Sequence, residues 1–420
     1  MSDSPPNKAA SRRKKNNYLS LVMLQHVSAW QHLAIFFVII LVTSTSLGWW
    51  LWDVPLTTPL DTSSSFSFLT GQIPKNTSEK IVYGFLPYWN IDDTTYQPEL
   101  THLGYFSLEI AADGSIVTRT DDGYLEPGYN KLQSDLFFEA IATSSAQPEI
   151  VFTQFYADTI TSFLHSDQAQ QNFIESLDSV LLAYPFSGVN IDIEYVGPVS
   201  DELRANYVSF IKLLDEHLEE KYQQIDLSID LYASAASKRT IWDVAALEPY
   251  VDYYIVMAYD FHRSSSTVAG PVAPLFGGKK EWDSDISEHL QAFLDTVPSK
   301  KILLGVPFYG YEWQTTSREA QAHTFPESGG TASYKRVQNL LLEKETLKVE
   351  EHWNESALSP YISYEEDGEI YVVYYENSRS ISYKLDFVNQ LDLAGIAIWA
   401  LGYEGDSREL WDVINRKVSL

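Results

Sequence analysis

Short apolar runs alternate with amphipathic stretches from residue 81 to the end of the chain. The runs are rich in Val, Ile, Tyr and Phe, which is typical of strands. The stretches between them, such as 168–184 and 201–222, repeat apolar residues at helical spacing. Nearly continuous apolar strands separated by helices indicate a parallel sheet covered on both faces. The eight strand-like runs are 81–89, 102–110, 149–155, 188–196, 225–232, 253–261, 302–310 and 395–401.

Eight strand–helix units over ~340 residues predict an α/β fold, a (β/α)8 TIM barrel that occupies residues 80–420. The seventh and eighth runs are about 85 residues apart, which is more than one connecting helix needs. The intervening stretch 348–378 is strand-like and carries a hairpin signal at Glu365–Glu369. The sequence therefore predicts a small α+β insertion between strands 7 and 8, at about 315–380.

The N-terminal pattern differs, because no charged residue occurs from Asn16 to Trp52. A span of twenty apolar or uncharged residues, Leu33–Trp52, covers ~30 Å as a helix, and its Trp-rich end is typical of a membrane interface. We expect a cytoplasmic basic tail (1–28), a transmembrane signal anchor (29–52) and a linker rich in Ser, Thr and Pro (53–79), with the barrel outside the cytoplasm. The alternative is a cleaved signal peptide and a secreted enzyme.

Composition narrows the chemistry. The chain has no Cys, which excludes disulfides, thiolate zinc sites and Cys nucleophiles. The net charge is −28, although residues 1–52 carry five basic residues against one acid, so the rest of the chain is strongly acidic. An acidic body repels nucleic acid, and we expect no nucleic-acid partner. The 11 Trp and 27 Tyr residues supply flat faces that can fill a core or stack on sugar rings.

One strand-like run carries three polar residues at alternate positions. In "SGVNIDIEYVG" (187–197), single apolar residues separate Asn190, Asp192 and Glu194, so these three share one face of the strand. In a barrel that face points to the axis, and Glu194 lies at the C-terminal end where barrel active sites are built. Burial and a neighbouring carboxylate raise the pKa of a carboxyl, so Glu194 is a candidate general acid. A polar layer satisfied internally and a divalent-cation site are the alternatives, but no His is nearby in sequence and we expect no metal or cofactor.

The same stretch resembles the D-G-x-D-x-D-x-E signature of family 18 glycoside hydrolases, which ends the fourth strand of a (β/α)8 barrel. Two positions depart from it, because Ser187 and Asn190 replace the first and second Asp. N-x-D-x-E resembles the bacterial branch of the family that includes spore and cell-wall hydrolases. Other stretches similar to family motifs, in the same order, are "MAYD" (257–260), "GVPFYG" (305–310), "YENSRSISYKLDF" (375–387) and "GIAIWALG" (395–402).

The resemblance implies a substrate-assisted reaction. Glu194 would protonate the glycosidic oxygen and then act as a base toward water. The sugar's own 2-acetamido oxygen would be the nucleophile, with Asp192 accepting a hydrogen bond from the acetamido N–H and Tyr259 donating one to its oxygen. The residues expected to bind or position the substrate are Asp260, Trp399, Asn190, Tyr309 and Met257. Asn190 would lie beneath Asp192 and orient it, and packing is the simpler role for Met257.

The implied function is retaining hydrolysis of β-1,4-linked N-acetylglucosamine glycans, namely chitin or chito-oligosaccharides. A peptidoglycan-cleaving N-acetylglucosaminidase is one alternative, because the same acetamido sugar occurs in both polymers. A non-catalytic glycan-binding protein of chitinase-like fold is another, since Ser187 and Asn190 depart from the signature.

Overall fold

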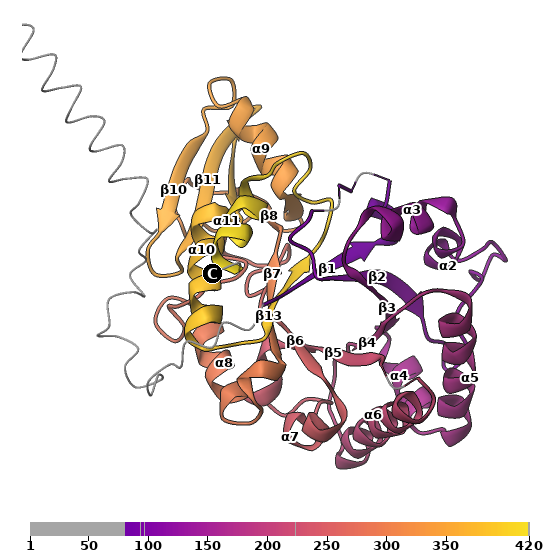
Figure 1. The fold of residues 1–420 in the computed structure, drawn as a ribbon. Helices are drawn as coiled ribbons and strands as arrows, with labels where there is room; N and C mark the ends of the chain where they lie inside the picture. Colours follow the sequence, from indigo (N-terminus) through magenta and orange to yellow (C-terminus); the bar gives the residue numbers. More distant parts are fainter. Residues whose placement is uncertain (1–79, 93, 96, 223, 419–420) are drawn as a thin grey trace, which may run out of the picture. The chain divides into compact units, whose positions relative to one another are not determined.

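The computed structural model describes residues 80–418, apart from residues 93, 96 and 223 (Figure 1). All of these residues fall within one unit, Ser63–Leu420. Across this described part of the chain, none of the helices has both the length and the apolar character that a membrane crossing requires. The predicted tail (1–28), signal anchor (29–52) and linker (53–79) lie outside the described residues and stay predictions.

Eight parallel strands close into a barrel in the order β1-β13-β7-β6-β5-β4-β3-β2, which confirms the predicted architecture (Figure 1). Seven of the eight apolar runs contain one of these strands, and the run 149–155 overlaps β3, which begins two residues earlier. Closure is made where β1 pairs with β13, with Val82 opposite Ile396. The strands are β1 (Ile81–Pro87), β2 (His102–Glu109), β3 (Gln147–Gln154), β4 (Gly188–Ile193), β5 (Asp226–Tyr232), β6 (Tyr253–Met257), β7 (Ile302–Pro307) and β13 (Gly395–Trp399).

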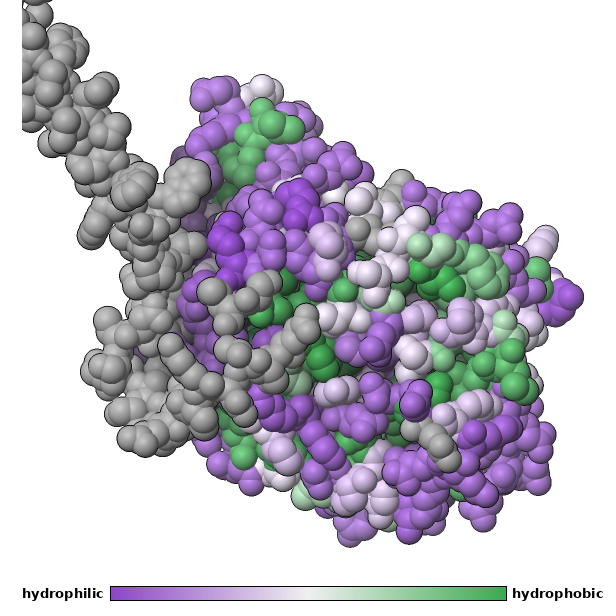
Figure 2. Space-filling model, in the orientation of Figure 1, coloured by the Kyte–Doolittle hydropathy of each residue, from purple (hydrophilic) through white to green (hydrophobic). Residues whose placement is uncertain are grey.

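Helices pack around the barrel, and most of their outward side chains are hydrophilic on the face that Figure 2 shows. The two predicted long helices are present as α5 and α6, and each begins at a serine whose side chain accepts a backbone N–H, Ser166 and Ser200. The helices are α2 (Pro127–Leu132), α3 (Asp135–Thr143), α4 (Ala157–Leu164), α5 (Asp167–Ala183), α6 (Asp201–Lys221), α7 (Val244–Leu247), α8 (Ile286–Leu294), α10 (Ser378–Gln390) and α11 (Glu409–Val418), with 3-10 turns at Tyr88–Asn90, Ala233–Ala236, Glu248–Tyr250 and Ser299–Lys301.

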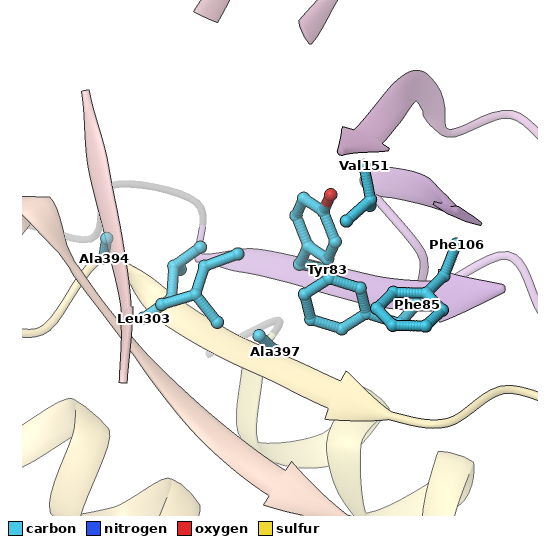
Figure 3. Packing of buried hydrophobic residues seen from close by; sticks show 8 residues of the cluster. Tyr83, Phe85, Phe106, Val151, Leu303, Ala394 and Ala397 are labelled. Atoms are coloured by element: carbon cyan, nitrogen blue, oxygen red, sulfur yellow. The ribbon is translucent and has the colours of Figure 1, made fainter. Parts of the chain in front are cut away.

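The interior of the barrel is filled by side chains rather than open. Tyr83 and Phe85 of β1 meet Phe106 of β2, Val151 of β3 and Leu303 of β7 in one buried cluster (Figure 3). The Tyr83 and Phe85 rings lie 4.8 Å apart between centroids. Such a packed interior leaves room for chemistry at the ends of the strands.

A second sheet lies between β7 and β13 in the chain. Its strand order is β10-β11-β12-β8-β9, and it begins at Tyr309, earlier than the expected 315, because β7 ends at Pro307. The hairpin signal is confirmed, since β11 and β12 pair across Asp367 and Gly368, which both have positive φ (53° and 86°). The elements are β8 (Tyr309–Thr315), β9 (Gly330–Ser333), α9 (Tyr334–Leu342), β10 (Glu350–Asn354), β11 (Ser359–Glu366) and β12 (Glu369–Tyr374).

Candidate active site

A cavity of about 330 Å³ lies at the C-terminal ends of the barrel strands. It gathers seven of the eight residues that the sequence singled out, and Asn190 does not line it. Aromatic and ionisable side chains predominate in its walls, as expected for a site that binds a polar ring. The lining residues are Phe106, Phe155, Asp192, Glu194, Asp230, Tyr232, Met257, Tyr259, Asp260, Arg263, Tyr309 and Trp399.

A larger hollow, of about 780 Å³, lies on the surface beside α6 and α7, and none of the predicted residues lines it. Arg204 pairs there with Asp243, at 3.1 Å between Nε and Oδ2, and Arg239 pairs with Asp201. Size alone therefore does not mark the site, and the smaller cavity holds the convergent acids and aromatics.

The alternation along β4 directs its acids inward. Val189, Ile191 and Ile193 are fully buried, whereas Asp192 lines the cavity. Glu194 follows the last residue of β4 and is half-buried, and its backbone N–H donates to the Gln154 carbonyl at 2.9 Å. That bond continues the β3–β4 ladder past the end of the strand and fixes Glu194 at the cavity.

β5 adds a carboxylate that sequence reasoning missed. Ser228 of β5 pairs with Asn190 of β4. Two residues further along each strand, on the same face, Asp230 therefore lies beside Asp192. Both carboxyl side chains line the cavity, and both residues are only 3% exposed. The signal was the alternation of Ser228, Asp230 and Tyr232 in "IDLSIDLY", which matches the polar alternation on β4.

Burial dominates the electrostatics of these acids. It raises the pKa of both Asp192 and Asp230 well above the usual aspartate value, and the charges of the neighbouring acids add to the effect. Burial also raises the pKa of Glu194, while a hydrogen bond from the Tyr232 hydroxyl opposes the shift. A carboxyl held in this way keeps its proton to higher pH and is able to donate it to a bound molecule.

Asp260 follows β6 and is held by several groups at once. The hydroxyls of Tyr309 and Tyr311 both donate to its Oδ1, the second at 3.0 Å, and Arg263 Nε lies 3.7 Å from its Oδ2. Its φ of 62° is in the left-handed region, where Asp is among the better tolerated residues. Tyr259, just before it, has its pKa raised well above 10 by burial and by the surrounding acids, so it stays a neutral hydroxyl donor.

Trp399 ends β13 and lies against other aromatic rings. The Phe106 ring stands edge-on to it at 4.6 Å between centroids, and the Phe85 ring is 5.7 Å away. Met257 ends β6 and is half-buried at the same cavity. The site thus combines a flat apolar wall with four acids and three tyrosines, a combination that suits a sugar ring.

Comparison with known families decides the identity. Residues 79–404 match the family described as glycosyl hydrolases family 18. The chain belongs to family 18 of the glycosyl hydrolases. It is therefore a glycoside hydrolase, and the resemblance in its β4 stretch is confirmed.

This family 18 hydrolase is similar both to a cortical fragment-lytic enzyme and to chitinases. A cortical fragment-lytic enzyme of Bacillus anthracis is 25% identical over 319 residues (73% of this chain, 65% of that protein). A class V chitinase of Arabidopsis thaliana is 24% identical over 261 residues (59% and 66%), so the chain spans about two thirds of both relatives. A family 18 chitinase from Cycas revoluta, solved with (GlcNAc)3, superposes with a TM-score of 0.67 at 22% identity (81% and 98%) and shows the shared fold.

Asn190 differs from the expectation for this family 18 hydrolase. It was expected to orient Asp192, but its amide nitrogen donates to Ser228 Oγ at 2.9 Å and to Asp230 Oδ1 at 3.0 Å. Its side chain is fully buried below the cavity. The direct partner of Asn190 is therefore the acid on β5. Among the residues that the structure describes, no cluster of three or more His, Asp or Glu could hold a metal ion.

Proposed function

We propose that this hydrolase cleaves β-1,4-linked N-acetylglucosamine glycans, chitin or chito-oligosaccharides, by a retaining, substrate-assisted reaction. The observation that carries the proposal is the meeting of Glu194, Asp192 and Tyr259 at one cavity, where burial raises the pKa of both acids. A proton donor, an anion-forming acid and a neutral hydroxyl are the three groups that such a reaction needs.

Glu194 is the general acid and base. Burial raises its pKa, which favours the protonated carboxyl that gives its proton to the glycosidic oxygen as the bond breaks. The carboxylate that remains then takes a proton from the attacking water, so Glu194 ends the cycle protonated. Its position at the open end of β4 supports contact with both the sugar linkage and solvent.

The nucleophile is the carbonyl oxygen of the sugar's 2-acetamido group, which attacks the anomeric carbon as the linkage breaks. Asp192 accepts a hydrogen bond from the acetamido N–H and offsets the positive charge that develops on the ring formed by this attack. Tyr259 donates to the acetamido oxygen and holds it near the anomeric carbon. Both residues line the cavity beside Glu194, which supports these assignments.

The remaining residues position the sugar. Trp399 offers a face for stacking at the cavity wall. Asp260 is held by Tyr309, Tyr311 and Arg263, so it presents a fixed oxygen to a sugar hydroxyl. Met257 fills space beside them.

Peptidoglycan is the second candidate substrate, and the similarity to a cortical fragment-lytic enzyme supports it. Both polymers contain the acetamido sugar that the proposed chemistry requires. Parallel digestion of chitin oligomers and of purified glycan strands by the full chain, with chromatography of the products, separates the two substrates.

The test of the reaction is hydrolysis of N-acetyl-chitohexaose by Glu194→Gln. The substitution preserves shape but removes the transferable proton, so we expect kcat to fall on the order of 100-fold or more with the fold intact. Glu220→Gln, at an exposed acid on α6, is the matched control. Proton NMR of the wild-type products should detect the β-anomer first, and either an inverted product or an active Glu194→Gln variant would contradict the proposal.

A further inference from the structure

We propose that Asp230 shares a single proton with Asp192 and takes that proton up when Asp192 acts as an anion toward the substrate. The inference rests on the proposed function for the role of Asp192, and it adds a residue from the neighbouring strand to the site. Asp230 is here a positioning residue, because it acts through Asp192.

The first support is geometric. Ile191 of β4 pairs with Ile229 of β5, Asp192 and Asp230 are the next residues of the two strands, and both line the cavity. Neighbouring strands of a sheet lie only about 5 Å apart. Two carboxyl groups at this spacing with 3% exposure each cannot both be ionised at low cost.

The second support is an incomplete hydrogen-bond pattern. Asn190 donates to Asp230 Oδ1, so its amide oxygen faces away from that bond. Within the described residues, neither Asn190 Oδ1 nor Asp192 Oδ1 has a hydrogen-bond donor, although both atoms are buried. Buried acceptors without donors are costly, and a proton on the carboxyl pair provides the donor that is lacking.

The third support is the charge of the surroundings. The pKa of Asp230 is raised first by burial, whereas the hydrogen bond from Asn190 favours its ionised form. The ionisable groups that interact most strongly with Asp230 are acids and phenols, and the cation that lines the same cavity, Arg263, acts on Glu194. The acids and phenols are Asp192 and Glu194 of β4 and its end, Glu149 of β3, Tyr83 of β1, Tyr207 of α6 and Tyr259 after β6.

These contacts define one proton movement. In the free enzyme Asp192 carries the proton and Asp230 is the carboxylate that Asn190 stabilises. When the acetamido N–H approaches, the O–H bond of Asp192 breaks and an O–H bond forms on Asp230, so the pair keeps one proton and one negative charge throughout. Asp192 is then the anion beside the developing positive charge, and the proton returns when the product leaves.

Proton counting tests the shared proton without any substrate. Acids with raised pKa bind protons in the folded state that the unfolded chain has released, so stability falls as pH rises. In the wild-type chain the shared proton should make the unfolding equilibrium constant, measured with urea between pH 6.5 and 8, rise about tenfold per pH unit. This part of the pH dependence should be absent in Asp192→Asn and equally absent in Asp230→Asn. The double variant should lose no more than either single variant.

Additive losses would mean two separate protons, and a loss in one single variant alone would assign the proton to one residue. Either result overturns the inference. Because these measurements need no turnover, they remain readable even if the wild-type chain proves inactive on chitin oligomers, which would contradict the proposed function instead.

A kinetic measurement tests the transfer. Asp230→Leu removes the neighbouring charge that keeps a proton on Asp192, so Asp192 should be ionised in this variant, as in Asp230→Asn. The fall of kcat on N-acetyl-chitohexaose at acid pH should therefore begin at a lower pH than in the wild type, with little change in KM. Ser228→Ala removes the other partner of Asn190 without changing charge and should keep the wild-type pH profile. A loss of kcat in Asp230→Leu that does not depend on pH would mean that Asp230 has only a structural role. If Asp230→Leu does not fold, the unfolding measurements on Asp192→Asn and Asp230→Asn test the inference.

Discussion

The two ends of the barrel interior both hold buried acids, and they differ in what those acids reach. At the mouth, Asp192, Asp230 and Glu194 line a cavity. At the opposite end, Glu149 near the start of β3 is 2% exposed and faces His102, with 4.0 Å between Oε1 and Nε2. Burial raises the pKa of Glu149 to about 8 and lowers the pKa of His102 to about 4, so the two meet as neutral groups at pH 7.

A raised pKa is therefore common to both ends and does not by itself identify a working acid. Glu149 lines neither of the two hollows described above, and Gly188 of β4 approaches its carboxyl so closely that an added Cβ would lie 2.5 Å away. The acids at the mouth follow the C-terminal ends of their strands, where loops leave a space for a ligand. Access to the cavity and a set of convergent partners distinguish the acids of the site from Glu149, which we call the sealed acid.

The largest effect expected is at the mouth, in Asp192→Asn. The amide cannot become the anion that offsets the developing positive charge, so kcat should fall on the order of 100- to 1,000-fold. Steady-state kinetics on N-acetyl-chitohexaose measure this loss, and thermal unfolding verifies the fold. Turnover within a few-fold of wild type would show that Asp192, like the sealed acid Glu149, has no part in the reaction.

A smaller loss is expected for Tyr259→Phe, which removes one neutral donor to the acetamido oxygen and keeps the ring. We expect kcat to fall about 10- to 100-fold. Tyr195→Phe, in the loop after β4, is the matched control, because the Tyr195 hydroxyl bonds to the Pro198 carbonyl at 3.2 Å outside the cavity. Equal effects in the two variants would show that the hydroxyl of Tyr259 has no special part in turnover.

The smallest effect on activity is expected at the sealed end, in Glu149→Gln, where kcat should not change. Stability should respond instead. The folded pKa of Glu149 is about 8, above its unfolded value, so folded wild type retains a proton and loses stability as pH rises toward 8. His102 acts in the opposite direction, but only below its unfolded pKa of about 6.5.

Between pH 6.5 and 8 the fall in stability should therefore be shallower in Glu149→Gln than in wild type, by up to ~1.4 kcal/mol per pH unit. Urea unfolding across this range measures the difference, with Glu139→Gln on the exposed face of α3 as control. Identical slopes would mean that Glu149 is ionised, and a loss of turnover would connect the sealed acid to the site.

Much of the architecture was readable from the chain because strand and helix periodicity is local. The eight apolar runs, the long helices α5 and α6 and the turn at Asp367 and Gly368 each depend on neighbouring residues. The alternation on β4 also predicted which of its side chains face the barrel axis. Asp192 and Glu194 were therefore candidate catalytic residues before any tertiary contact was known.

The sequence alone determined the barrel strands, the inward acids of β4 and the family motifs, because each is a pattern within a short stretch. Only the tertiary structure decided that Asp230 stands beside Asp192, that Asn190 serves Asp230, and that Tyr311 of the second sheet reaches Asp260. These pairs depend on strand register and on segments about 40 to 50 residues apart meeting at one end of the barrel, and local periodicity does not encode that register.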